Sequence, residues 1–225
     1  MAEEPLPAHS AGVLSRAEEE ASFYHEAALN ASWTGARLGI GSLTFAFGAF
    51  VFAFFYLKSL NSHDMWYPTA TLKPPQAWAG ALVMALVVAS AAIQTGVLQL
   101  IKAGGKAAWL AGAVLALVLG LAAIGVEVWQ LLNLPFQPGA AGFASVFTGF
   151  YPVFIVIAFA VMVWLEMLIM RCRPVPAISF VEQPPTYAEA FAVQRFQASL
   201  SAFTVAWNYL AVVAIVAWVL FYQVH

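Results

Sequence analysis

Two carboxylates lie inside apolar stretches of membrane-spanning length, and they are the first candidates for chemistry. Glu127 falls near the end of one stretch and Glu166 near the end of the next. Ionisable side chains within a bilayer are costly, so they are functional candidates by default. At a rise of about 1.5 Å per residue, the two carboxylates lie roughly 20 Å or more apart along the bilayer normal. They therefore cannot form the carboxylate pair of an acid–base site.

Each carboxylate also has a structural interpretation. Glu166 lies about one helical turn before Arg171, which favours an interfacial carboxylate near a cation. Glu127 lies deeper, next to Gln130 and Asn133. Two interpretations of Glu127 stay open: it forms hydrogen bonds within a helix bundle, or it holds a partner subunit.

Metal and heme sites need histidine, cysteine or methionine at defined positions. All four histidines lie outside the apolar stretches, at His9, His25, His63 and His225. The single cysteine, Cys172, excludes an intrachain disulfide and a cysteine metal cluster. His63 and Asp64 are adjacent and could bind a metal, but a solvated surface pair is the simpler interpretation. The sequence predicts no catalytic, cofactor or metal site in this chain.

Composition sets the class of protein. Of the 225 residues, 63% are hydrophobic and only 9% are charged, whereas a soluble domain carries about a quarter charged residues. The net charge of −2 gives no reason to expect nucleic acid as a partner. The sequence predicts an all-α integral membrane protein, a bundle of five transmembrane helices. We expect them at about 35–57, 76–101, 108–132, 143–170 and 196–222.

The chain is expected to have two parts. Residues 1–32 are polar and acidic, with no basic region followed by an apolar run, so no cleavable signal peptide is expected. Residues 33–225 form the five-helix transmembrane domain. Seven of the nine lysines and arginines flank one side of the predicted spans, and only Lys58 and Lys73 flank the other. The positive-inside rule therefore predicts a cytoplasmic N-terminus and an external C-terminus.

Two local features bear on packing. Gly35 and Gly39 have the small-xxx-small spacing that lets helices approach closely. Pro152 lies within the fourth predicted span, where its missing N–H predicts a kink or a late helix start. The span opens on residues 148–154, Thr-Gly-Phe-Tyr-Pro-Val-Phe.

Several segments, taken together in order, resemble subunit III of the heme–copper terminal oxidases. They are Arg37-Leu38-Gly39, Phe47-Gly48-Ala49 and Phe55-Tyr56-Leu57-Lys58 in the first span, then Trp129 to Asn133, Ser145 to Phe150, and Trp207 to Trp218. The resemblance covers about residues 37–222. The five-span count and the predicted orientation fit the short bacterial form of that subunit.

The ionisable residues typical of that family are replaced here. The family's buried glutamate falls at Leu43, its two histidines after Thr-Gly-Phe fall at Tyr151 and Phe154, and its last-helix histidine and aspartate fall at Asn208 and Ala211. The resemblance implies an accessory subunit of the bacterial inner membrane that packs on the catalytic subunit I and binds phospholipid. Heme and copper are then expected in the partner subunits. The packing role needs only shape and small residues, whereas a direct proton role loses its carboxylate.

Three other hypotheses remain. The chain could be a subunit III-like partner of a nitric oxide reductase, or a protein that assembles or stabilises another membrane complex. It could instead be a small transporter or channel with Gln94, Gln99, Glu127 and Asn208 as a polar pathway. A subunit is expected to co-purify with a hemoprotein, and a transporter is expected to respond to a solute without one.

Overall fold

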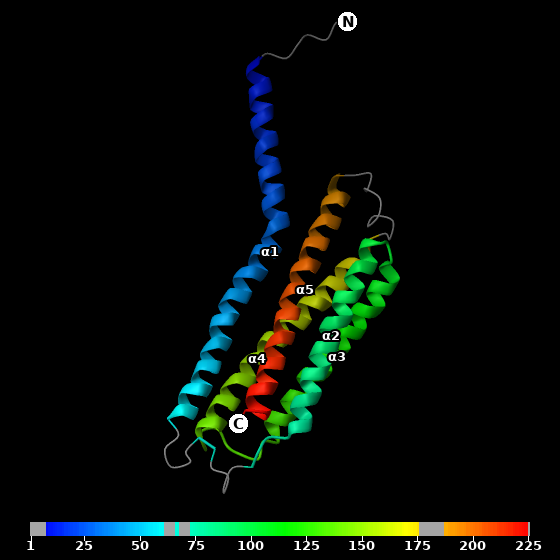
Figure 1. Cartoon of the computed structure of the whole chain (residues 1–225). Helices are drawn as coiled ribbons and strands as arrows, with labels where there is room; N and C mark the ends of the chain where they lie inside the picture. Colours follow the sequence, from blue (N-terminus) through cyan, green and yellow to red (C-terminus); the bar gives the residue numbers. More distant parts are fainter. Residues whose placement is uncertain (1–7, 61–65, 68–72, 176–186, 225) are drawn as a thin grey trace, which may run out of the picture.

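The computed structural model describes residues 8–60, 66–67, 73–175 and 187–224. Within these ranges it is all-helical, with five helices and no strands (Figure 1). The helices are α1 (Ala8–Ser59), α2 (Ala77–Lys102), α3 (Lys106–Leu132), α4 (Gly142–Cys172) and α5 (Tyr187–Tyr222). Each contains a segment long and apolar enough to cross a membrane. The chain is therefore a multi-pass membrane protein.

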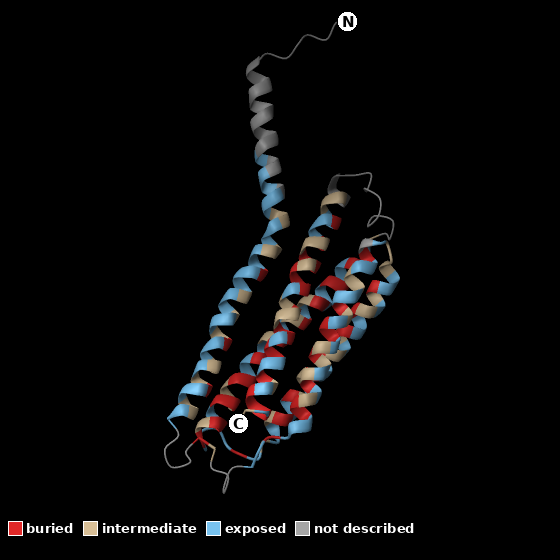
Figure 2. Ribbon diagram, viewed as in Figure 1, coloured by how far each residue is buried: buried red, intermediate tan, exposed pale blue. Residues whose placement is uncertain are grey.

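Four of the helices close a ring, and the fifth packs on its outside. α2 contacts α3 and α5, and α4 contacts the other sides of both α3 and α5. α1 lies along the edge formed by α4 and α5, and its N-terminal part extends beyond the bundle (Figure 1). α1 is the least buried of the five, as the pale blue ribbon in Figure 2 shows.

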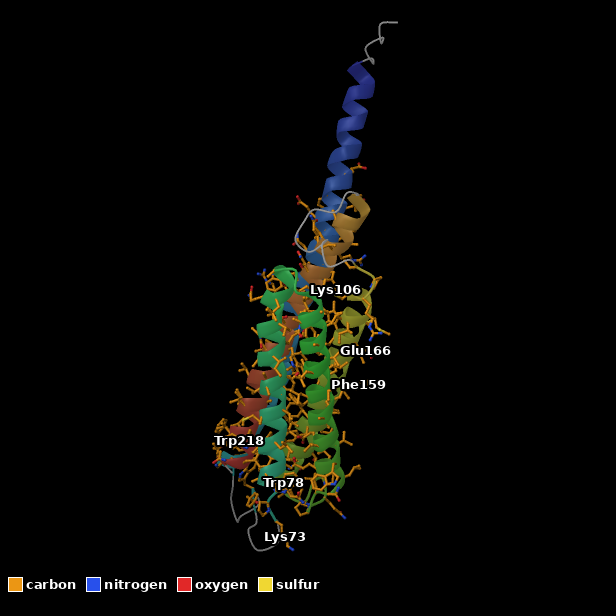
Figure 3. All side chains as sticks on the ribbon, turned by 90° about the vertical axis from the view of Figure 1, so that its right-hand side faces the viewer. Lys73, Trp78, Lys106, Phe159, Glu166 and Trp218 are labelled. Carbon is orange, nitrogen blue, oxygen red and sulfur yellow. The ribbon has the colours of Figure 1, made fainter. Side chains whose placement is uncertain are left out.

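The bundle has two distinct ends. We call one end the C-terminal end, because it holds the last turn of α5, the start of α2 and the end of α3. There, Lys58 Nζ donates a hydrogen bond to the Val224 carbonyl. At the opposite end, Lys106 Nζ donates to the Arg173 carbonyl at 2.7 Å, and so fastens the start of α3 to the end of α4. Figure 3 shows Lys106 and Glu166 toward that end, with Lys73, Trp78 and Trp218 toward the C-terminal end.

The core at the C-terminal end is aromatic. Phe143, Phe147 and Phe150 on α4 pack against Phe221 on α5, with ring centroids 5.3–6.0 Å apart. Aromatic pairs at such distances add stability beyond their buried area. This cluster locks α4 to α5.

The predicted spans are confirmed with small shifts for α2, α3 and α4 and larger ones for α1 and α5. α1 is one continuous helix of 52 residues, because no proline separates the polar segment from the first span between residues 8 and 34. α5 likewise begins nine residues before the predicted 196. Of the two alternatives at Pro152, a kink or a late helix start, the structure excludes the late start, because α4 begins at Gly142 and continues through the proline.

Candidate functional site

The side chain of Glu127 lies inside the bundle. It is 1% exposed and comes from α3, about 8 Å from the helix end at Leu132 by the usual rise per residue. Among the described residues, no group lies within hydrogen-bonding distance of either carboxylate oxygen. Buried polar groups normally have a partner, so this one needs an explanation. The hypothesis that Glu127 hydrogen-bonds within the bundle is not supported by the side-chain contacts.

Glu127 borders a small enclosed space between α2, α3, α4 and α5. Its volume is about 10 Å³, and its polar neighbours are Tyr151 on α4 and Trp218 on α5. The Trp218 indole nitrogen is also buried and has no partner among the described residues. The rest of the lining is apolar: Val83, Met84, Phe150, Phe154, Ala214 and Ala217, with Gly80. Two unpaired polar groups of complementary type thus border one space.

A hydrogen-bonded chain connects this space with the end of α5. The Tyr151 hydroxyl donates to the Tyr222 oxygen. Gln130 Nε2 donates to the same oxygen at 2.7 Å and also reaches the Gln76 carbonyl at 3.4 Å. Gln76 is exposed at the start of α2. The chain therefore reaches from the Glu127 space to the surface of the C-terminal end.

Gly80 makes room for Tyr222 in this series of hydrogen bonds. The Tyr222 ring occupies the position that a side chain at Gly80 would fill, and its hydroxyl oxygen would lie 2.7 Å from the added Cβ. Sequence analysis does not single out Gly80 or Tyr222. The sequence contains only a glycine about one turn into one span and a tyrosine in the last turn of another. That these two residues contact each other is visible only in the packed structure.

The other predicted polar residues lie elsewhere. Gln94 is fully buried on α2, and neither amide atom has a partner among the described residues. Asn208 Nδ2 donates to Thr95 Oγ1 at 3.0 Å, linking α5 to α2 on a partly exposed face. Gln94 and Asn208 lie about 25 and 21 Å from the C-terminal end, and Glu127 about 8 Å. The structure does not bring them into one continuous polar pathway.

Glu166 is exposed on α4, toward the end opposite to Glu127 (Figure 3). Its position agrees with the interpretation of an interfacial carboxylate. Tyr151 and Phe154, at the positions of the family's histidines, are buried in the aromatic core. Leu43 is half-buried on α1, and Ala211 is buried on α5.

Within the described residues, no group of three or more histidine, cysteine or acidic side chains is arranged to hold a metal ion. His63, Asp64 and His225 lie outside the described residues, and the side chains of His9 and His25 are also not described. Cys172 is buried as a free thiol.

Open glycines lie on two nearly opposite sides of α1, Gly35 with Gly39 and Gly41 with Gly48, at about 100° per residue. Gly35, Gly39, Gly41 and Gly48 on α1 have open space where a side chain would be. Gly35 and Gly39 line an apolar groove of about 360 Å³ between α1, α4 and α5, within the range of small-ligand sites of about 300–1,000 Å³. A second apolar groove of about 160 Å³ lies nearer the C-terminal end. The small residues of α1 are thus not used for close helix packing within this chain.

No protein-family model matches this chain, and no curated protein matches it in sequence. The resemblance to oxidase subunit III therefore stays a hypothesis that depends on the quoted residues.

Proposed function

We propose that this chain is a non-catalytic subunit of a larger membrane complex. The observation that carries the proposal is the unpacked face of α1 at Gly35 and Gly39, two open glycines beside an apolar groove. Small residues at helix surfaces let another helix approach closely in a membrane, where tight packing replaces the hydrophobic effect as a driving force. A helix that leaves such a face open within its own chain is suited to a partner helix.

Polar side chains on the outside of the bundle support the same proposal. Thr95 is exposed and Asn208 is half-buried, and they bond to each other within the membrane-spanning part of α2 and α5. On α1, Thr44 is exposed and its hydroxyl donates to Tyr209 Oη at 3.1 Å. Lipid tails offer no hydrogen bonds, so polar groups on a lipid-facing surface favour a protein neighbour.

Within this class, the finer proposal is a subunit III-like partner of a heme–copper terminal oxidase. It is supported by the sequence segments of the first, fourth and fifth spans, which resemble those of the oxidase subunit and occur in the same order, and by the number of spans. Heme and copper then belong to the partner subunit I. The second apolar groove, nearer the C-terminal end, is the proposed site for a phospholipid acyl chain. The charge distribution supports a cytoplasmic N-terminus in the bacterial inner membrane.

The test is co-purification. The tagged full chain is extracted in a mild detergent from cells grown with oxygen, and the complex is analysed by native electrophoresis and by its heme absorbance. Gly39→Leu fills the open face of α1 and is expected to reduce recovery of the partner. Gly125→Leu is the matched control, because Gly125 also faces open space but lies on α3, away from the proposed contact face. Leucine is a better helix former than glycine, so neither change should unfold its helix.

The outcomes separate the hypotheses. A co-purified hemoprotein that reduces oxygen supports the oxidase assignment, and one that reduces nitric oxide supports the reductase alternative. A stable partner that carries no heme would support the hypothesis that the chain is a subunit of another membrane complex. A chain that is stable alone and whose stability responds to a solute would contradict the subunit proposal.

A further inference from the structure

The space bordered by Glu127 brings together unsatisfied polar groups from two helices. The carboxyl group of Glu127 and the indole N–H of Trp218 both lack a partner among the described residues, and both border the same 10 Å³. A volume of about 10–15 Å³ is the smallest that holds one water molecule, which needs two to four polar partners. Glu127, Trp218 and Tyr151 supply three.

An ionised carboxylate in this position is strongly disfavoured. It would be removed from water, with no cation opposite and no hydrogen bond to distribute its charge. The elements around it bring no compensating charge. α4 contributes Tyr151 and α5 contributes Tyr222 as the titratable groups nearby, and the α2 residues of the lining are not ionisable.

We propose that Glu127 is a proton-binding site, which carries one proton as a neutral carboxylic acid and binds one water molecule in this space. The acid O–H donates to the water, and the Trp218 N–H donates to the same water. The water in turn donates to Tyr151, whose oxygen has free lone pairs because its own proton is given to Tyr222. Every buried polar group of the space then has a partner.

The same arrangement defines where the proton comes from. Tyr222 is the last residue of α5, so the chain from Glu127 through water and Tyr151 ends at the C-terminal end of the bundle. Hydroxyl groups and water can each accept a proton on one side and release one on the other. Release follows these hydrogen bonds as they point: the acid proton of Glu127 passes to the water, a water proton to Tyr151, and the Tyr151 proton to Tyr222, which gives up its own proton toward the C-terminal end. Uptake needs each hydroxyl turned the other way, so that Tyr222 protonates Tyr151, Tyr151 protonates the water and the water protonates Glu127. The site is therefore connected toward the C-terminal end through Tyr222, which is itself buried.

This inference does not depend on the proposed partner, because Glu127 is enclosed by its own chain. Infrared spectroscopy of the full chain in lipid bilayers at about pH 7, where a water-exposed glutamate with a pKa of about 4.3 is ionised, tests it directly. We expect a carbonyl band of a protonated carboxylic acid that is lost in Glu127→Gln and kept in Glu166→Gln. Deuterium oxide is expected to shift this band.

Tyr151→Phe and Tyr222→Phe leave the carboxyl group in place and test the connection. In each variant the acid band is expected to remain, while its exchange with deuterium slows by about tenfold, the equivalent of one lost hydrogen bond. An unchanged spectrum in Glu127→Gln, with normal helix content by circular dichroism, would overturn the proton site. Equal exchange rates in both tyrosine variants and the unmodified protein would overturn the connection through Tyr151 and Tyr222.

Discussion

Replacement of Gly80 by alanine is expected to destabilise the protein, although alanine is the better helix former. The added methyl group would lie within the Tyr222 ring, so the ring must move away from α2. Tyr222 is held by its hydrogen bond from Gln130 at 2.7 Å and by packing on Phe147. A shift of the ring therefore breaks the bond as well as the packing.

The magnitude follows from three terms. Overpacking a filled core costs about 1–3 kcal/mol. A lost hydrogen bond costs about 0.5–1.5 kcal/mol, and the gain in helix propensity from glycine to alanine returns about 1 kcal/mol. The net loss in the free energy of unfolding is about 2 kcal/mol. For a chain of this size that lowers Tm by roughly 4–8 °C.

Thermal unfolding in detergent, followed by circular dichroism, measures this loss. Gly96→Ala is the matched control, because Gly96 lies on the same helix and has open space around it. It is expected to leave Tm unchanged or slightly higher. Equal Tm values for Gly80→Ala and Gly96→Ala would refute the packing of Tyr222 against α2.

Two further substitutions test buried polar contacts. Ser90 Oγ accepts a hydrogen bond from the Trp207 indole at 3.0 Å and donates one to a carbonyl of α3 at 2.7 Å. Ser90→Ala is therefore expected to lower the free energy of unfolding by about 1–3 kcal/mol. Ser145→Ala, which loses only a local hydrogen bond to the Ala141 carbonyl, should cost less in the same thermal assay. Glu127→Gln is expected to weaken assembly or activity of the isolated complex more than Glu166→Gln. Wild-type activity of the proposed complex in both variants would remove any role of these carboxylates in that complex.

The number and type of the helices could be predicted from sequence because each span is a long apolar run between polar connections. The boundaries of α2, α3 and α4 follow because Lys102, Lys106 and Pro135 mark sharp changes in composition. The boundaries of α1 and α5 do not, because their helices continue into polar sequence that lacks a helix breaker. Hydropathy predicts which residues lie within the bilayer, but it does not predict where a helix ends outside it.

The candidate site was predicted only in part. Glu127 stands out in sequence because it is a charge in an apolar run. Its surroundings cannot be predicted, because Gly80, Tyr151, Trp218 and Tyr222 come from three other helices. Whether these residues come together depends on how each helix is rotated about its axis and on which helices are neighbours. The periodicity of an apolar span does not predict either, because its lipid-facing and buried sides are both apolar.

The position of α1 has a consequence for how the protein is made. Of the five described helices, α1 emerges from the ribosome before the other four, yet it packs mainly on α5 and α4, which are synthesised after α2 and α3. α2 and α3 pack on each other and can pair at once as a hairpin. α1 must therefore remain in the bilayer without its final neighbours until α5 has been synthesised. Truncation of the chain before α5 should leave α1 accessible to membrane proteases and insertion factors, while the α2–α3 hairpin is already protected.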